Sequence, residues 1–178
     1  MSNKAVFCIA KSEAQATRIV DELKNASFSN DDISALFPDK QGTRDFAHEQ
    51  KTKAPEGAAT GAGAGGLLGG TLGWLAGIGA LAIPGVGPLI AAGPIMGLLS
   101  GAAVGAATGG LTGALVGYGI PELEAKQYEG KVKGGNILLS VHTEDGDEVS
   151  RVKEIFKKNN AEDITYTGEA SVPRAAHA

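Results

Sequence analysis

The fold is decided by a short apolar run, Ala5-Val6-Phe7-Cys8-Ile9-Ala10, and by the pattern that follows it. The run has the length and the β-branched and aromatic content of a strand. Ser12 and Gln15 then form a capping-box pattern, and apolar residues recur at helical spacing as far as Ala26. A second short run, residues 33–37, ends at a Pro-Asp pair. The N-terminal part therefore predicts a strand, a helix and a strand.

The C-terminal part of the chain repeats this plan. Residues 136–142 have the pattern of a strand, Asp145 and Glu148 can cap the next helix, and residues 164–166 begin a last strand. The strand-to-strand offsets are 28 and 27 residues, counted from residue 5 to 33 and from 137 to 164. A duplicated βαβ unit predicts an α+β fold, a ferredoxin-like sandwich with one antiparallel sheet and two helices on one face. The alternative is a coincidence between two common units.

All charged residues lie outside one long segment in the middle of the chain. Of the 178 residues, 36 are Asp, Glu, Lys or Arg, yet residues 57–121 contain none of these and none of the three His. The same segment holds 21 of the 27 glycines. The net charge of −4 gives no basic footprint, which disfavours non-specific binding to nucleic acid. We therefore expect a charged domain that is interrupted by an uncharged insertion.

Two glycine ladders with four-residue spacing run through the uncharged segment. This spacing places the glycines of a ladder along one ridge of a helix, where backbones can approach closely. Between the ladders, residues 83–88 give a strong turn signal. The sequence therefore predicts a helical hairpin. Its turn contains Pro84, Gly85, Gly87 and Pro88, and its helix-packing and oligomerisation positions are Gly57, Gly61, Gly65, Gly69, Gly73, Gly77, Gly93, Gly97, Gly101, Gly105, Gly109, Gly113 and Gly117.

These patterns divide the chain into six segments. The two halves of the ferredoxin-like domain are residues 1–39 and 136–169. Between them we expect a linker at residues 40–56, the glycine-zipper hairpin at 57–120 and a connecting helix at 121–135. After the second half we expect a tail at residues 170–178.

Each arm of the predicted hairpin is long enough to cross the hydrocarbon core of a membrane. Lysines and an arginine flank the uncharged segment on both sides, so the positive-inside rule puts both termini in the cytoplasm. We expect the hairpin to associate with the bacterial inner membrane and to form a homo-oligomer. The alternatives are a cytoplasmic assembly or filament, in which the hairpins form a buried core, and a flexible linker.

Several segments, taken in order, resemble the bacterial general stress protein family with a glycine-zipper insertion. Besides the ladders, they are Ala54-Pro-Glu-Gly-Ala-Ala-Thr, Ala80-Leu-Ala-Ile-Pro-Gly-Val-Gly-Pro, Gly117-Tyr-Gly-Ile-Pro-Glu-Leu-Glu-Ala and Gly134-Gly-Asn-Ile-Leu-Leu-Ser-Val-His. That family is similar to heat- or cold-induced stress proteins and is otherwise largely a domain of unknown function. The resemblance implies a stress-linked, non-enzymatic role with membrane association, and it carries over no catalytic residues.

Two short motifs suggest chemistry that the rest of the sequence does not support. Residues 61–66 satisfy G-x-G-x-x-G, but a dinucleotide site also needs an acidic residue about 20 positions further on, and none occurs before Glu122. Val116-Gly117-Tyr118-Gly119 is similar to a potassium-filter sequence, but Leu115 stands in the threonine position. The glycine ladder and coincidence explain these motifs better.

The remaining candidate groups are also weak. His48, His142 and His177 are too scattered to indicate a metal site, and the lone Cys8 is expected to pack in the core. We therefore expect no enzyme, no catalytic or metal-ligating residues, no cofactor and no nucleic-acid partner. A small-molecule ligand of the domain stays unknown.

Overall fold

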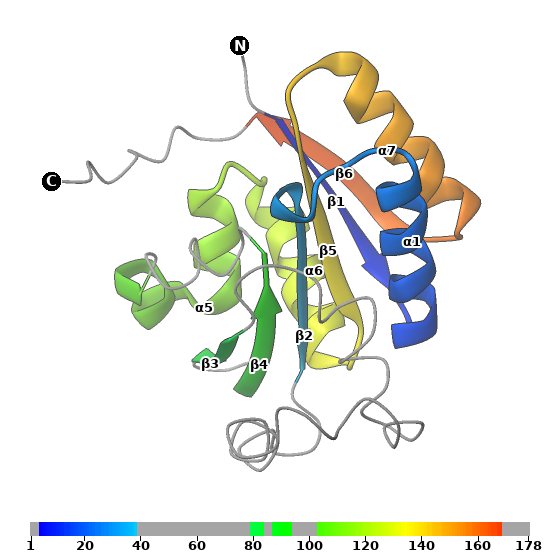
Figure 1. Cartoon of the computed structure of the whole chain (residues 1–178). Helices are drawn as coiled ribbons and strands as arrows, with labels where there is room; N and C mark the ends of the chain where they lie inside the picture. The colour runs from blue at the N-terminus through cyan, green and yellow to red at the C-terminus, as the bar shows by residue number, and fades with distance from the viewer. Residues whose placement is uncertain (1–3, 39–78, 84–86, 94–102, 169–178) are drawn as a thin grey trace, which may run out of the picture.

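The computed structural model describes residues 4–38, 79–83, 87–93 and 103–168, which form an α+β fold (Figure 1). Within these residues, four α-helices and a short 3-10 helix accompany an antiparallel sheet of six strands in the order β3-β4-β2-β5-β1-β6. The elements are β1 (Lys4–Ala10), α1 (Glu13–Asn25), η1 (Asn30–Asp32), β2 (Ile33–Pro38), β3 (Gly79–Ile83), β4 (Gly87–Ala92), α5 (Ala103–Gly117), α6 (Glu122–Lys133), β5 (Ile137–Thr143), α7 (Gly146–Lys158) and β6 (Glu162–Gly168).

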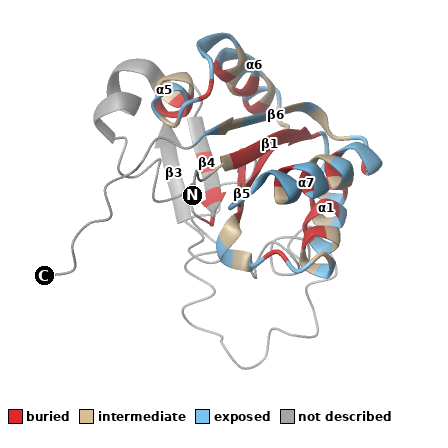
Figure 2. Cartoon of the chain, turned by 90° about the horizontal axis from the view of Figure 1, so that it is seen from above, coloured by how far each residue is buried: buried red, intermediate tan, exposed pale blue. Residues whose placement is uncertain are grey.

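Helices cover both faces of the sheet (Figure 2). Helices α1 and α7 pack on one face, over a core that includes Val6 and Cys8 of β1. Helices α5 and α6 pack on the other face, over a core that includes Phe7 and Ile9 of the same strand. Because β1 is apolar at every position from Ala5 to Ala10, it needs apolar partners on both sides. Helices α1 and α7 lie on one face, as the sequence predicts for the two βαβ units, and the helices on the other face are additional to the predicted sandwich.

Helices α1 and α7 match their expected caps. The side chain of Ser12 accepts a hydrogen bond from the Gln15 amide at the start of α1, and Asp145 accepts one from the Glu148 amide at the start of α7. Each helix also ends in the same way, because the second residue after it, Ser27 or Asn160, adopts a left-handed backbone conformation. The short-range patterns of the flanks therefore predict local structure down to the caps.

The middle of the chain differs from the predicted helical hairpin. Strands β3 and β4 form a β-hairpin in which Ile83 lies opposite Gly87, so the chain reverses between these two residues. Strand β4 then pairs with β2 and extends the sheet. Glycine destabilises a helix by about 1 kcal/mol relative to alanine, whereas the edge of β2 offers backbone partners to an extended chain. The other predicted hairpin residues, 57–78, 84–86 and 94–102, lie outside the described residues.

Among the described residues of the second arm of the predicted hairpin, Ala103–Gly117 are helical, and this helix is broken. Helix α5 contains Gly110 with φ 62° and ψ −150°, which separates it into two helical pieces. The second piece contributes Leu111, Ala114 and Leu115 to the core under α6. Within the part of the chain that the structure describes, no helix has the length and apolar content needed to cross a membrane.

Candidate functional site

Five of the thirteen predicted packing glycines lie within the described residues. Gly93 follows β4, and Gly105, Gly109, Gly113 and Gly117 lie in α5. Of the predicted turn residues, Gly87 and Pro88 belong to β4. The remaining predicted packing and turn positions lie outside the described residues. They are Gly57, Gly61, Gly65, Gly69, Gly73, Gly77, Pro84, Gly85, Gly97 and Gly101.

Gly93 lies against the backbone of β2. Its φ is +83°, and a Cβ atom added there would lie 2.1 Å from the carbonyl oxygen of Ile33 and 2.9 Å from the Cα atom of Ser34. Both the backbone conformation and the available space therefore require glycine. A close backbone approach occurs at this position, but it joins a strand end to a neighbouring strand and not one helix to another, as the ladder predicts.

Gly117 has a different environment. It is the last residue of α5, and no atom lies within 4 Å of an added Cβ. The break at Gly110 also falls between Gly109 and Gly113, so these ladder members do not share one straight helix. The described part of the second ladder therefore does not form a single packing ridge.

The break in α5 is capped by a carboxylate from α6. Glu129 accepts hydrogen bonds from the backbone N–H and the side-chain hydroxyl of Thr112, at 2.7 and 2.6 Å, and forms an ion pair with Lys133 at 2.8 Å. Burial raises the pKa of the Glu129 carboxyl, but the hydrogen bonds from Lys133 and Thr112 outweigh it, so the pKa is below its usual value. Glu129 thus stabilises the new helix start that the break at Gly110 creates.

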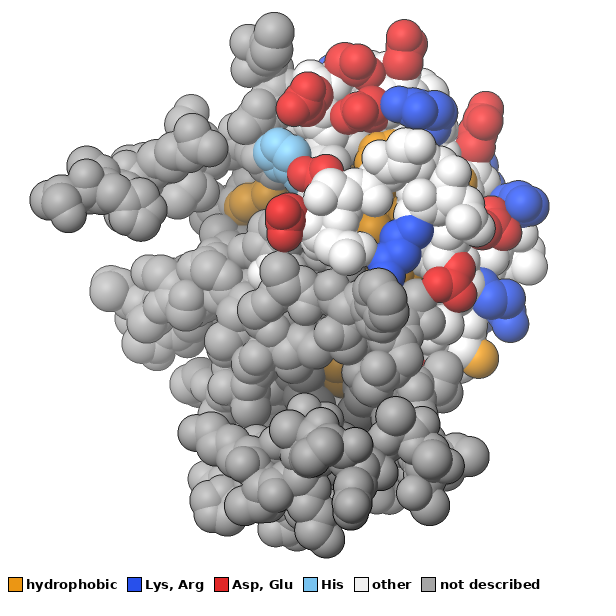
Figure 3. Space-filling model, viewed as in Figure 1, with side chains coloured by type: hydrophobic (Ala, Val, Ile, Leu, Met, Phe, Trp, Pro, Cys, Tyr) orange, Lys and Arg blue, Asp and Glu red, His pale blue; other side chains and the backbone are white. Residues whose placement is uncertain are grey.

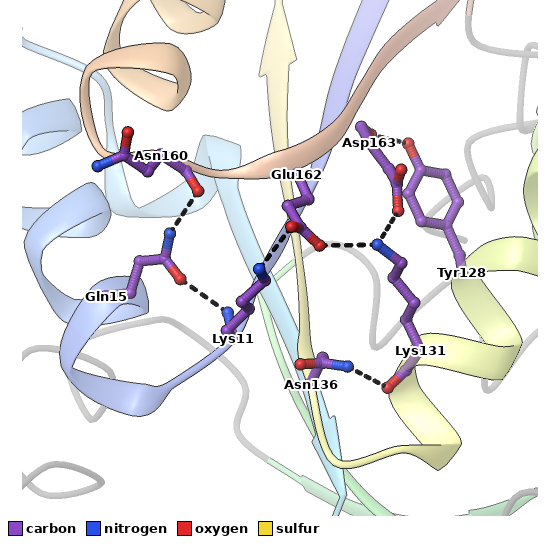
Figure 4. A network of polar contacts seen from close by, with 8 residues as sticks. All are labelled: Lys11, Gln15, Tyr128, Lys131, Asn136, Asn160, Glu162 and Asp163. Carbon is purple, nitrogen blue, oxygen red and sulfur yellow. Dashed lines mark hydrogen bonds and ion pairs between the residues drawn. The ribbon is translucent and has the colours of Figure 1, made fainter.

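A second polar cluster lies at the start of β6 (Figure 4). We call it the Glu162 cluster. Its centre is the Glu162 carboxylate, which lies between the ammonium groups of Lys11, in the connection from β1 to α1, and Lys131, in α6. Lys131 is 2.8 Å from Glu162 and 2.7 Å from the Asp163 carboxylate. The other members are Gln15, Tyr128, Asn136 and Asn160.

The Glu162 cluster is built around an irregularity in β6. The pairing of β1 with β6 shifts register between Phe7 and Ile9, and Asp163 has a left-handed φ of 48°. The buried Tyr128 hydroxyl donates a 2.6 Å hydrogen bond to the Asp163 carbonyl. Burial raises the pKa of Tyr128, so its hydroxyl stays protonated as this donor.

The charges of the cluster stabilise each other. Hydrogen bonds from Lys11 and Lys131 lower the pKa of Glu162 to about 2, and those to Asp163 and Glu162 raise the pKa of Lys131. On the other side of Glu162, Gln15 accepts a 2.7 Å hydrogen bond from the Lys11 amide and donates bonds of 2.8 and 2.9 Å to the carbonyls of Asn159 and Asn160. The Glu162 cluster therefore connects strand β6 to both helical layers, the one of α1 and α7 and the one of α5 and α6.

The arrangement of the Glu162 cluster favours a structural role for its charged side chains. Its two carboxylates and two ammonium groups are already engaged with one another. The sequence does not reveal this cluster, because Lys11, Lys131 and Glu162 are far apart in the chain and no short motif connects them. The one local signal is the Glu-Asp pair at the start of a predicted strand.

On the face seen in Figure 3, acidic and basic side chains of the described residues lie interspersed. No family model matches the chain, and comparisons with curated proteins and with solved structures find no match either.

Proposed function

We propose that this chain is a non-enzymatic, self-associating stress-response protein, in which an α+β head carries a glycine-rich insertion. One observation carries the proposal: the sheet of the head continues into the uncharged segment through β4, and β3 is its last strand among the described residues. A sheet that ends in an uncharged strand has an edge suited to association. The stress-linked role rests on the resemblance of the ordered motifs to bacterial general stress proteins.

The head is proposed to be a ferredoxin-like unit with added strands. Strand β5 pairs antiparallel with both β1 and β2, so β1 and β2 run parallel with β5 between them. In the same way, β1 lies between β5 and β6. Each βαβ unit is therefore split by a strand of the other, and α1 and α7 lie on one face, which supports this proposal.

The absence of catalysis and of a nucleic-acid partner is part of the proposal. The charged groups of the Glu162 cluster join α6, the connection from β1 to α1, and β6. This arrangement supports a structural role for these groups. The mixed charges seen in Figure 3 and the net charge of −4 support a surface without attraction to phosphates.

Attachment to the bacterial inner membrane, with both termini in the cytoplasm, is the second candidate. It is favoured by two large apolar side chains near the connection of α5 to α6, where Val116 is 42% exposed and Leu123 is 72% exposed. This connection ends the uncharged segment. Exposed apolar side chains beside such a segment suit insertion into the interface of a lipid bilayer.

Cell fractionation followed by sedimentation separates these two functions. Self-association without lipid predicts that the full chain stays in the supernatant after membranes are pelleted and sediments as a particle larger than one chain. A membrane pellet that releases the chain only with detergent would favour the second candidate. A soluble chain that sediments as a monomer at every concentration would contradict both.

A further inference from the structure

The two edges of the sheet differ in how they are protected against pairing. The β6 edge has a register shift, the left-handed Asp163, and charged side chains at Glu162 and Asp163. Irregularity and charge are the devices by which natural sheets prevent the addition of another strand. These devices protect the start of β6.

The β3 edge carries none of these devices. Its sequence, Gly79-Ala-Leu-Ala-Ile83, has no charge and no proline, and all five residues pair in unbroken register with β4. Among the described residues, β4 is the only strand that pairs with β3. In an edge strand, the N–H and C=O groups of alternate residues point away from the neighbouring strand and remain available to another.

We propose that β3 pairs antiparallel with β3 of a second copy of this chain across a twofold axis. This inference rests on the proposed self-association and names the surface that performs it. Full overlap of the two five-residue strands places Gly79 opposite Ile83 and Leu81 opposite Leu81. The two six-stranded sheets then form one continuous sheet.

A second copy is the occupant that fits this edge best. The strand is uncharged, so two copies meet without like-charge repulsion, and a twofold contact satisfies the same backbone groups on both partners. The twofold contact uses the β3 edge of both copies, and the irregularity and charge at the start of β6 disfavour further strand addition at the other edge. The inference therefore predicts a closed dimer.

The test uses the full chain and matched lysine variants at the two edges. Ala82→Lys adds a charge to β3, and Gly168→Lys adds one at the end of β6, where no atom lies within 4 Å of an added Cβ. Light scattering after gel filtration should give two chains for the wild type and Gly168→Lys, and one chain for Ala82→Lys. Circular dichroism establishes that each variant is folded.

A cysteine variant tests the register without relying on loss of assembly. Directly opposite residues in antiparallel strands have Cα atoms about 4.5–5.5 Å apart, which suits a disulfide. Leu81→Cys should therefore form a covalent dimer under mild oxidation, whereas Gly168→Cys should not. The buried Cys8 is retained in both variants.

The outcomes separate this inference from the proposed function. A wild-type chain that is monomeric at all concentrations overturns both. An assembly that persists in Ala82→Lys, together with a Leu81→Cys variant that does not crosslink, overturns the edge pairing and leaves self-association through another surface, including one that residues 39–78 provide.

Discussion

At the scale of single residues, the glycines of the second ladder differ in what they require. Gly93 combines a φ of +83° with the backbone of Ile33 only 2.1 Å from an added Cβ, whereas Gly117 has open space around it. Their four-residue spacing is the same, so the spacing alone does not indicate which glycine is needed. The backbone conformation and the neighbouring atoms of each position determine whether glycine is required there.

The pair gives a matched test. Gly93→Ala should lower the free energy of unfolding by roughly 2–4 kcal/mol, because the new methyl group meets backbone and the left-handed conformation is strained. Gly117→Ala should leave the free energy of unfolding unchanged or raise it by up to about 1 kcal/mol. Urea denaturation measures both. Equal losses in the two variants would contradict this assignment.

Glu162 provides a prediction about pH. Its pKa is lowered to about 2 in the folded chain, so its contribution is fully present above its usual pKa and is lost as the pH falls towards 2. Glu162→Gln should therefore melt at a lower temperature than the wild type at pH 7. The difference should shrink steadily below pH 4.5. Thermal unfolding across this range checks it, and a difference that does not change with pH would contradict the ion pairs.

At the scale of elements, helix α5 is shaped by its break as much as by its helical pieces. Gly110 interrupts the backbone, and the Glu129 carboxylate takes up the N–H of Thr112 just beyond it. A break with its own cap has a defined geometry. Helix α6 therefore positions the second piece of α5 over Phe7 and Leu138 in the sheet.

Removal of this cap should be measurable. Glu129→Ala should lower the free energy of unfolding by about 1–2 kcal/mol, the usual range for loss of a helix cap. Glu122→Ala is the control, because its ion pair with Lys126 is exposed and joins residues of one helix. Denaturant titration compares the two, and a Glu129→Ala variant no less stable than the control would contradict the capping role.

The elements also show what the sequence could predict. Strands β1, β2, β5 and β6 and helices α1 and α7 follow from periodicity and caps, because these signals lie within a few residues of one another. The hairpin of β3 and β4 does not, since its extended form depends on the edge of β2, more than 40 residues earlier in the chain. The Glu162 cluster was missed for the same reason, because tertiary structure alone brings its residues together.

At the scale of the whole molecule, the described part of the insertion belongs to the same fold as the head. Strand β4 and helix α5 supply Leu89, Ala91, Leu111 and Leu115 to the second core, beside Phe7 of β1. The uncharged segment thus contributes to the stability of the sheet that it extends. Both the proposed self-association and the pairing of β3 depend on this placement.

Disulfide formation between β2 and β4 tests this placement most directly. Ala35 and Ala92 lie opposite each other, so cysteines at both positions should join under mild oxidation. The control pair, Ala35→Cys with Ala82→Cys, places the second thiol on β3. It lies two strand spacings, roughly 10 Å, across the sheet and four residues further along it, and should stay reduced. Rapid crosslinking of the first pair alone is the predicted result. Free thiols in both double variants, with position 92 labelled as readily as in the unfolded chain, would contradict the placement of β4 beside β2.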